Sequence, residues 1–202
     1  MIYNVKKQSK EVTKLNYIKE NKSLISKLIV NHIAISIFGL IMAIVGRFLA
    51  SRNGGRMALY YAVGILAVLL YAVILYVNLW ELGAKDKIKV DSGRMKLNIL
   101  NGLYISLFAN IPTIIFGIFA TINCYVESDF TGILAALSPL YNGMYTVLTD
   151  AKGLALGTYF PPVFIFLCIP ALIISLVSYI LGVKGYNCLF PEPKKQQDQN
   201  RE

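Results

Sequence analysis

The sequence predicts an all-α membrane protein, a polytopic helix bundle with four transmembrane helices. Hydrophobic residues make up 56% of its 202 residues and charged residues only 15%, whereas a soluble domain usually carries about 25% charged residues. The charge is also uneven, because long stretches have none while the two ends and one middle loop hold nearly all of it. The uncharged stretches are apolar on every face, so they indicate membrane-spanning helices.

Each apolar stretch is long enough to cross a bilayer, because about 23 helical residues rise roughly 35 Å and the hydrocarbon core is about 30 Å thick. The expected helices are residues 28–50, 58–80, 99–121 and 160–182. They form a single transmembrane domain, residues 28–183, between a lysine-rich lead (1–27) and a tail (184–202). The lead is polar and the first apolar run is long, so we expect no cleavable signal peptide.

Positive charges predict the orientation, because lysine and arginine gather on the cytoplasmic side of a membrane. The lead, the loop 81–96 and the tail hold most of the 20 basic residues. The opposite side has only Arg47, Arg52, Arg56 and Lys152. We therefore expect a multi-pass protein of the cell membrane with both termini in the cytoplasm. Contacts with anionic lipid account for the net charge of +9, so we expect no nucleic-acid partner.

The two halves of the chain resemble each other, which predicts two tandem parallel helical hairpins. The segment 35–38 of the first helix corresponds to 105–108 of the third, 70 positions later. The end of the second helix, 80–85, corresponds to 179–184, 99 positions later. The offsets differ by 29 residues, which predicts an insertion in the outer loop 122–159. Chance similarity between apolar helices is the alternative.

The Leu-Gly-x-Lys ends of the second and fourth helices have a structural explanation. A glycine can close a helix, and the lysine after it faces the helix dipole and the lipid phosphates. The aromatic residue one turn earlier belongs to the interfacial belt. We therefore expect four residues to contact lipid headgroups, namely Trp80, Lys85, Tyr179 and Lys184.

The third helix carries a stripe of small residues that favours close packing against another helix. The stripe consists of Ala109, Thr113, Gly117 and Thr121, four residues apart. Ser106 and Asn110 flank it, and Pro112 removes one helical hydrogen bond, as Pro170 does in the fourth helix. We expect these groups to bind a neighbouring helix. A binding site for a substrate or ion at Ser106, Asn110 and Pro112 is the alternative.

The outer loop contains an apolar stretch, residues 132–148, that is interrupted by Ser138-Pro139 and Asn142-Gly143. These breakers argue against a fifth span, so we expect a re-entrant or interfacial helical hairpin whose backbone is shielded by other helices. A ligand on the outer side would bind here. The candidates are Tyr125, Asp129, Tyr141, Asn142 and Tyr145.

Three further polar features are expected to be structural. His32 lies at the cytoplasmic entrance of the first helix without acidic or cysteine partners, so we predict no metal and no cofactor. Arg47 is expected to reach the outer headgroups, and the loop 81–96 to form a solvated connector. No acidic residue is expected deep in a span, which disfavours proton coupling through a membrane carboxylate.

The residues favour three functions in a definite order. The first is a non-catalytic accessory or interaction subunit whose partners are membrane lipids and other membrane proteins or copies of itself. The second is a component of a small-solute transporter with a path near Asn110, Pro112 and Pro170. A lipid-acting enzyme comes last, because the sequence has none of the common catalytic motifs and we predict no catalytic residue. The frequent Lys, Asn, Ile and Tyr are typical of an AT-rich bacterium.

Reporter fusions test the topology. We expect reporters at residues 54 and 202 to lie on opposite faces of the membrane, because the predicted helices place these positions at opposite ends. The face on which each fusion lies is measured with two reporters, one that is active only outside the cell and one that is active only inside. A fusion at residue 94 is the control and should behave like the fusion at 202; fusions at 54 and 202 on the same face would contradict the topology.

Overall fold

The computed structural model of the chain describes residues 14–52, 54, 57–126, 129–150, 154–186 and 188. Its elements within these residues are all helices. Three helices are long and apolar enough to cross a membrane, and a bent pair of shorter helices makes a fourth if the pair crosses as one span. The predicted all-α membrane helix bundle is therefore confirmed, with three or four helices able to span where four were predicted.

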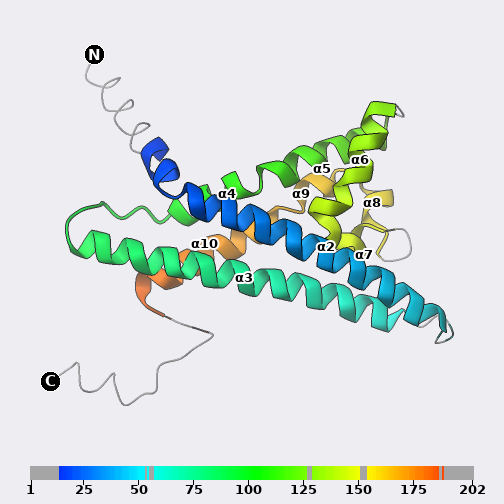
Figure 1. Cartoon of the computed structure of the whole chain (residues 1–202), viewed down its shortest axis with the longest axis horizontal. Helices are drawn as coiled ribbons and strands as arrows, with labels where there is room; N and C mark the ends of the chain where they lie inside the picture. Colours follow the sequence, from blue (N-terminus) through cyan, green and yellow to red (C-terminus); the bar gives the residue numbers. More distant parts are fainter. Residues whose placement is uncertain are drawn as a thin grey trace.

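The first two spans form a long antiparallel hairpin of α2 (Lys22–Arg52) and α3 (Ala58–Asp91) (Figure 1). The face of α2 that is buried in the bundle consists mostly of small residues three or four positions apart, which lets neighbouring backbones approach closely. Only 28% of the most apolar window of α2 and 33% of that of α3 is buried. The remaining apolar surface needs a lipid solvent, because exposing it to water would be unfavourable.

Helix α3 is longer than the sequence predicts. It continues through Asp91, although the second helix is expected to end near residue 80 and a connector to follow over 81–96. The expectation of a connector is wrong for its first part, where Glu81 and Lys85 form an ion pair of 2.6 Å on successive helical turns. The chain then turns at Gly93, whose φ of 71° is left-handed; a Ser-Gly pair is a common turn sequence.

The other two spans are both broken next to a proline. Helices α4 (Asn101–Ala109) and α5 (Ile111–Asn123) meet at Asn110 with a bend of 52°. Helices α9 (Val163–Phe166) and α10 (Ile169–Lys184) meet at residues 167–168. Pro112 and Pro170 each lie in the first turn after the break, where a helix needs no donor from the missing N–H. The kink predicted at Pro112 is present, whereas α9 and α10 together form one span that is interrupted at residues 167–168 but not bent by more than 40°.

The outer segment folds back into the bundle. It consists of α6 (Asp129–Asn142), η1 (Gly143–Tyr145), α7 (Thr146–Thr149) and α8 (Leu156–Tyr159). Helix α6 packs along α5 and also contacts α2 (Figure 1). At its tip, a Cβ on Gly143 would overlap the Ser36 carbonyl, and one on Gly39 would lie 2.5 Å from the Cα of Met144. This geometry fits the re-entrant alternative, since α2 and α5 shield the tip.

Helices α3 and α10 cross through a reciprocal pair of glycines. A Cβ on Gly83 would overlap the carbonyl oxygen of Tyr179, and a Cβ on Gly182 would overlap that of Trp80. The expectation that these two glycines close their helices is therefore wrong: both lie in helix interiors and allow close backbone approach. The glycine that closes α10 is Gly185, which has a left-handed φ of 77°.

Substitution of Gly182 tests this crossing. We expect Gly182→Ala to destabilise the protein by about 1–3 kcal/mol, because the added methyl group forces the two helices apart. Thermal unfolding of the purified protein in detergent measures the effect. The matched control is Gly132→Ala in α6, where the nearest atom to an added Cβ lies 3.9 Å away. Equal stability of the two variants would contradict the close crossing.

Candidate functional site

A row of buried polar side chains runs lengthwise through the apolar bundle. We call this row the polar file. Its members come from α2, α3, α4, α5, α6 and α10 and from the break between α4 and α5 at Asn110. They are Asp86, Tyr179, Asn101, Ser175, Ser106, Asn110, Tyr71, His32, Thr113, Asn142 and Ser138, each at most 7% exposed. Burying so many polar groups is costly unless they pair, and polar groups inside a membrane bundle often mark a functional path.

The inner end of the polar file is a carboxylate held by two tyrosines. The fully buried Asp86 accepts hydrogen bonds on Oδ2 from the hydroxyls of Tyr17, at 2.6 Å, and Tyr179, at 2.7 Å. Its Oδ1 has no hydrogen-bond partner among the described residues. Burial, and then the hydrogen bond to Asp86, raises the pKa of Tyr17 well above its usual range, so this hydroxyl remains a donor. Tyr17 thereby ties the helical segment 14–20 to the bundle.

The middle of the polar file crosses from α10 to the break in the third span. Ser175 donates to the Oγ of Ser106 at 2.9 Å. The side-chain amide of Asn110 donates to the Ser106 carbonyl at 2.8 Å, while its Oδ1 has no hydrogen-bond partner within the described part of the chain. The Tyr71 side chain lies close enough to interact with both Asn110 and Cys168. Both helix breaks therefore adjoin Tyr71.

His32 joins three segments of the chain at the level of these breaks. Its Nδ1 lies 2.7 Å from the Tyr71 hydroxyl, and its Nε2 lies 2.5 Å from the Tyr141 carbonyl and 3.0 Å from the Thr113 hydroxyl. A neutral imidazole with its proton on Nε2 would donate to the carbonyl and accept from Tyr71. His32 was expected at the entrance of the first helix. This expectation is wrong, because the His32 side chain is 4% exposed and lies inside the bundle.

Beyond His32, the polar file reaches a cavity of about 350 Å³, which we call the outer cavity because residues of the predicted outer loop line it. It lies between α2, α5, α6, α7 and α9. Asn142 and Ser138 line it, and the Asn142 amide donates to the Ser138 Oγ at 3.2 Å. The Oδ1 of Asn142 is without a hydrogen-bond partner in the described residues. The remaining polar side chains that line the cavity are Asn123, Thr146, Thr149 and Asp150.

An ion pair borders the outer cavity. Arg47 pairs with the Oδ2 of Asp150, and the Tyr60 hydroxyl donates to the same oxygen at 3.0 Å. The guanidinium of Arg47 binds a carboxylate of the loop after α7, and because its side chain is still 40% exposed, the contact with outer headgroups stays a prediction. The pair ties α2 and α3 to the end of the re-entrant segment.

The small-residue stripe of the third span faces the segment before and within α9. A Cβ on Gly117 would overlap the Phe164 carbonyl, and Thr121 donates to the Pro161 carbonyl at 3.1 Å. Ala109, the first residue of the stripe, is also buried. Thr113 points to His32 instead and so belongs to the polar file.

The residues expected at lipid headgroups divide into two groups. Lys85 and Lys184 are exposed, and Trp80 is half-buried with its indole donating to the Tyr186 carbonyl at 2.7 Å. The expected headgroup contact of Tyr179 is wrong, because its side chain is 0% exposed and binds Asp86. The candidates on the outer side differ in exposure: Tyr125 and Asp129 are exposed, whereas Tyr145 is buried. The ring of Tyr141 stacks on that of Phe116, with 4.4 Å between the ring centroids.

Four members of the polar file were not predicted from the sequence, namely Asp86, Tyr71, Asn101 and Ser175, and Asp86 was missed because it was expected in a loop. A signal for it exists in the spacing of α3. The buried positions 71, 75, 79 and 82 continue at helical intervals to Asp86. Such spacing predicts that the helix, with its buried face, extends to Asp86.

The clamp on Asp86 can be tested by a double-mutant cycle. We expect Tyr17→Phe and Tyr179→Phe each to lower the free energy of unfolding by about 1–3 kcal/mol, because each removes one donor from a buried carboxyl group. The double variant should lose more than the sum, since Asp86 then has no donor left. Unfolding in detergent measures this. Tyr104→Phe is the control, since Tyr104 meets Lys14 through its ring face; additive losses would contradict the shared clamp.

Comparison with known proteins adds no relative: no family model, no curated protein and no solved structure matches this chain.

Proposed function

We propose that this protein is a component of a membrane transporter for a small polar solute, and that the solute path follows the polar file. The observation that carries this proposal is that the file leads from Asp86, through both helix breaks, to the outer cavity. A bundle that only anchors or assembles has no need for this many polar groups in its interior, because each costs free energy to bury.

The broken helices support a path rather than simple packing. In membrane proteins, non-helical backbone at membrane depth occurs where it is buried in protein or lines a cavity, and transporters use broken helices to build binding sites there. Here the breaks at Asn110 and at residues 167–168 adjoin Tyr71, and the re-entrant tip meets His32. The Oδ1 atoms of Asn110 and Asn142, which have no hydrogen-bond partner among the described residues, provide acceptors on either side of His32.

The proposal includes the orientation and the repeat. The described ends of the chain and the connection from α3 to α4 lie toward one end of the bundle, and the turn between α2 and α3 lies at the other (Figure 1). With the lysine distribution, this arrangement supports a cell-membrane protein with both termini in the cytoplasm. The reciprocal contacts of Gly83 and Gly182 join equivalent positions of the two proposed hairpins, which supports the internal repeat.

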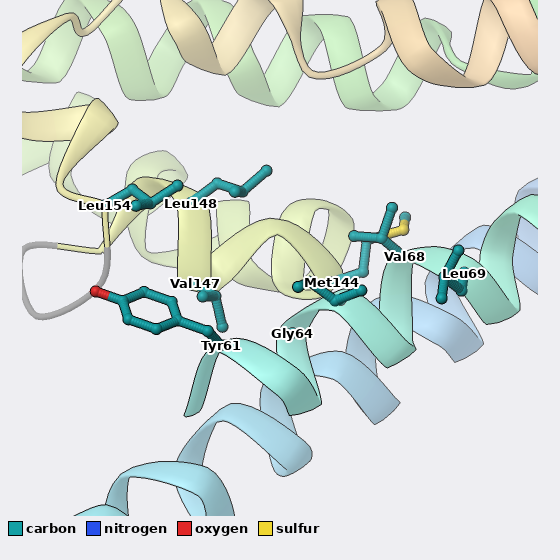
Figure 2. A pocket seen from close by; sticks show the side chains of 9 residues that line it. Tyr61, Gly64, Val68, Leu69, Met144, Val147, Leu148 and Leu154 are labelled. Carbon is teal, nitrogen blue, oxygen red and sulfur yellow. The ribbon is translucent and has the colours of Figure 1, made fainter. Parts of the chain in front are cut away.

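An accessory or interaction subunit, the first expectation from the sequence, becomes the second candidate. It is favoured by an apolar cavity of about 350 Å³ between α3 and α7, lined by side chains such as Val68, Leu69, Met144 and Val147 (Figure 2). A lipid chain or an apolar partner helix suits such a wall. This cavity does not explain the polar file, so the accessory role ranks second, and a lipid-acting enzyme remains the third alternative.

Flux measurements on purified protein in liposomes test the proposal. We expect the wild-type protein to admit at least one small polar solute from a panel of glycerol, urea, and the chlorides of sodium, potassium and ammonium, followed by light scattering. Asn110→Leu should reduce this flux at least tenfold, because it places an apolar group at the break in the third span.

The matched control is Asn78→Leu. Asn78 is buried in α3, but it donates to the carbonyl of Ile74 and lies outside the polar file. Its replacement should leave the flux unchanged. Wild-type liposomes that are no more permeable than empty ones, or an Asn110→Leu protein that loses assembly but keeps its flux, would contradict transport and favour the accessory role.

A further inference from the structure

We propose that the outer cavity binds a small protonated alkylamine. This inference rests on the proposed transport function and names the class of its solute. Four properties of the cavity carry it: its size, the hydrogen bonds already made by its polar wall, its charge and its apolar wall.

The size and the two-sided lining suit a small amphipathic molecule. A volume of about 350 Å³ lies at the lower end of the range of about 300–1,000 Å³ for small-molecule sites. One wall is apolar and includes Leu40, Ala120, Pro139 and Phe164. A bare ion would leave this wall without a partner, whereas a short alkyl chain can pack against it.

The polar wall has already used several of its hydrogen-bond donors. The Thr146 hydroxyl donates to the Gly143 carbonyl at 2.6 Å, and the Thr149 hydroxyl donates to the Tyr145 carbonyl at 3.3 Å. The lone pairs of these oxygens are therefore what they can offer to a ligand. Asn142, 4% exposed, donates through its amide to Ser138, and its Oδ1 has no partner in the described structure. A ligand with N–H groups suits these acceptors.

The charges favour a cation over an anion. Asp150 contributes a carboxylate to the lining; Arg47 and Tyr60 hold its Oδ2, which leaves Oδ1 for a ligand, and the described lining residues include no lysine or arginine. The ring of Phe164 is a further partner for a positive group. A transition metal is disfavoured, because the described residues contain no group of three or more His, Cys, Asp or Glu side chains that could hold one. An ammonium group provides both the positive charge and the N–H donors.

Binding of n-butylammonium to the full-length protein in nanodiscs tests the inference, with saturation-transfer NMR or calorimetry as the readout. We expect n-butylammonium to bind at least tenfold more tightly than 1-butanol, which has the same chain without the charge. Potassium should not compete, since it cannot use the apolar wall, and butyrate should not bind. Butyrate or 1-butanol that binds as tightly as the amine would overturn the inference.

Two variants locate the site. Asn142→Leu and Thr149→Val should each weaken n-butylammonium binding about tenfold, because each removes an acceptor from the wall, while Asn78→Leu should bind like the wild type. Thr149→Val keeps the test decisive if Asn142→Leu does not fold. Unchanged binding by a folded Asn142→Leu or Thr149→Val protein would overturn the assignment to this cavity.

The binding and flux experiments can fail independently. Flux of another solute without amine binding would refute the amine and leave transport intact. Amine binding without any flux through the wild-type protein would refute transport and leave the binding site intact.

Discussion

The imidazole of His32 connects the parts of the bundle on which the rest of the structure depends. One ring nitrogen meets Tyr71 of α3, and the other meets Thr113 of α5 and the carbonyl of Tyr141, near the end of α6. Ser36, one turn further along α2, donates to the same carbonyl at 3.0 Å. A carbonyl at the end of a helix has lost its helical donor, and the surrounding lipid offers none. The re-entrant tip can therefore stay inside the bundle because α2 supplies the missing hydrogens.

Close backbone contact is the second condition for this architecture. Gly39 and Gly143 let the tip lie directly on α2, and Gly83 and Gly182 do the same for the crossing of α3 with α10. In lipid, apolar side chains gain little by meeting each other instead of lipid tails, so tight packing of small residues replaces the hydrophobic driving force. The large apolar side chains can then point outward, as the low buried fractions of α2 and α3 require.

These two conditions place the polar groups where a solute could use them. The prolines and the re-entrant tip interrupt regular helices near Tyr71 and His32. At these interruptions, Asn110 and Asn142 keep acceptor atoms that have no partner in the described part of the chain. The outer cavity lies at the end of this row and offers acceptors on one wall and apolar contacts on the other. Transport and amine binding are thus two proposals about one continuous feature, whereas the apolar cavity beside α3 is separate and supports the accessory role.

The sequence by itself determined the membrane class, the approximate positions of up to four spans and the kink at Pro112, while for the outer segment it left a re-entrant and an interfacial arrangement open. Length, absence of charge and helix breakers are local properties, so they can be recognised without knowing the neighbours. Only the tertiary structure decided which faces are buried: it removed Tyr179 from the lipid surface, brought His32 inside and extended α3 to the buried Asp86. The reason is physical. In a soluble helix the polar face marks the outside, but in lipid both faces are apolar, so the sequence carries little information on which side chains meet.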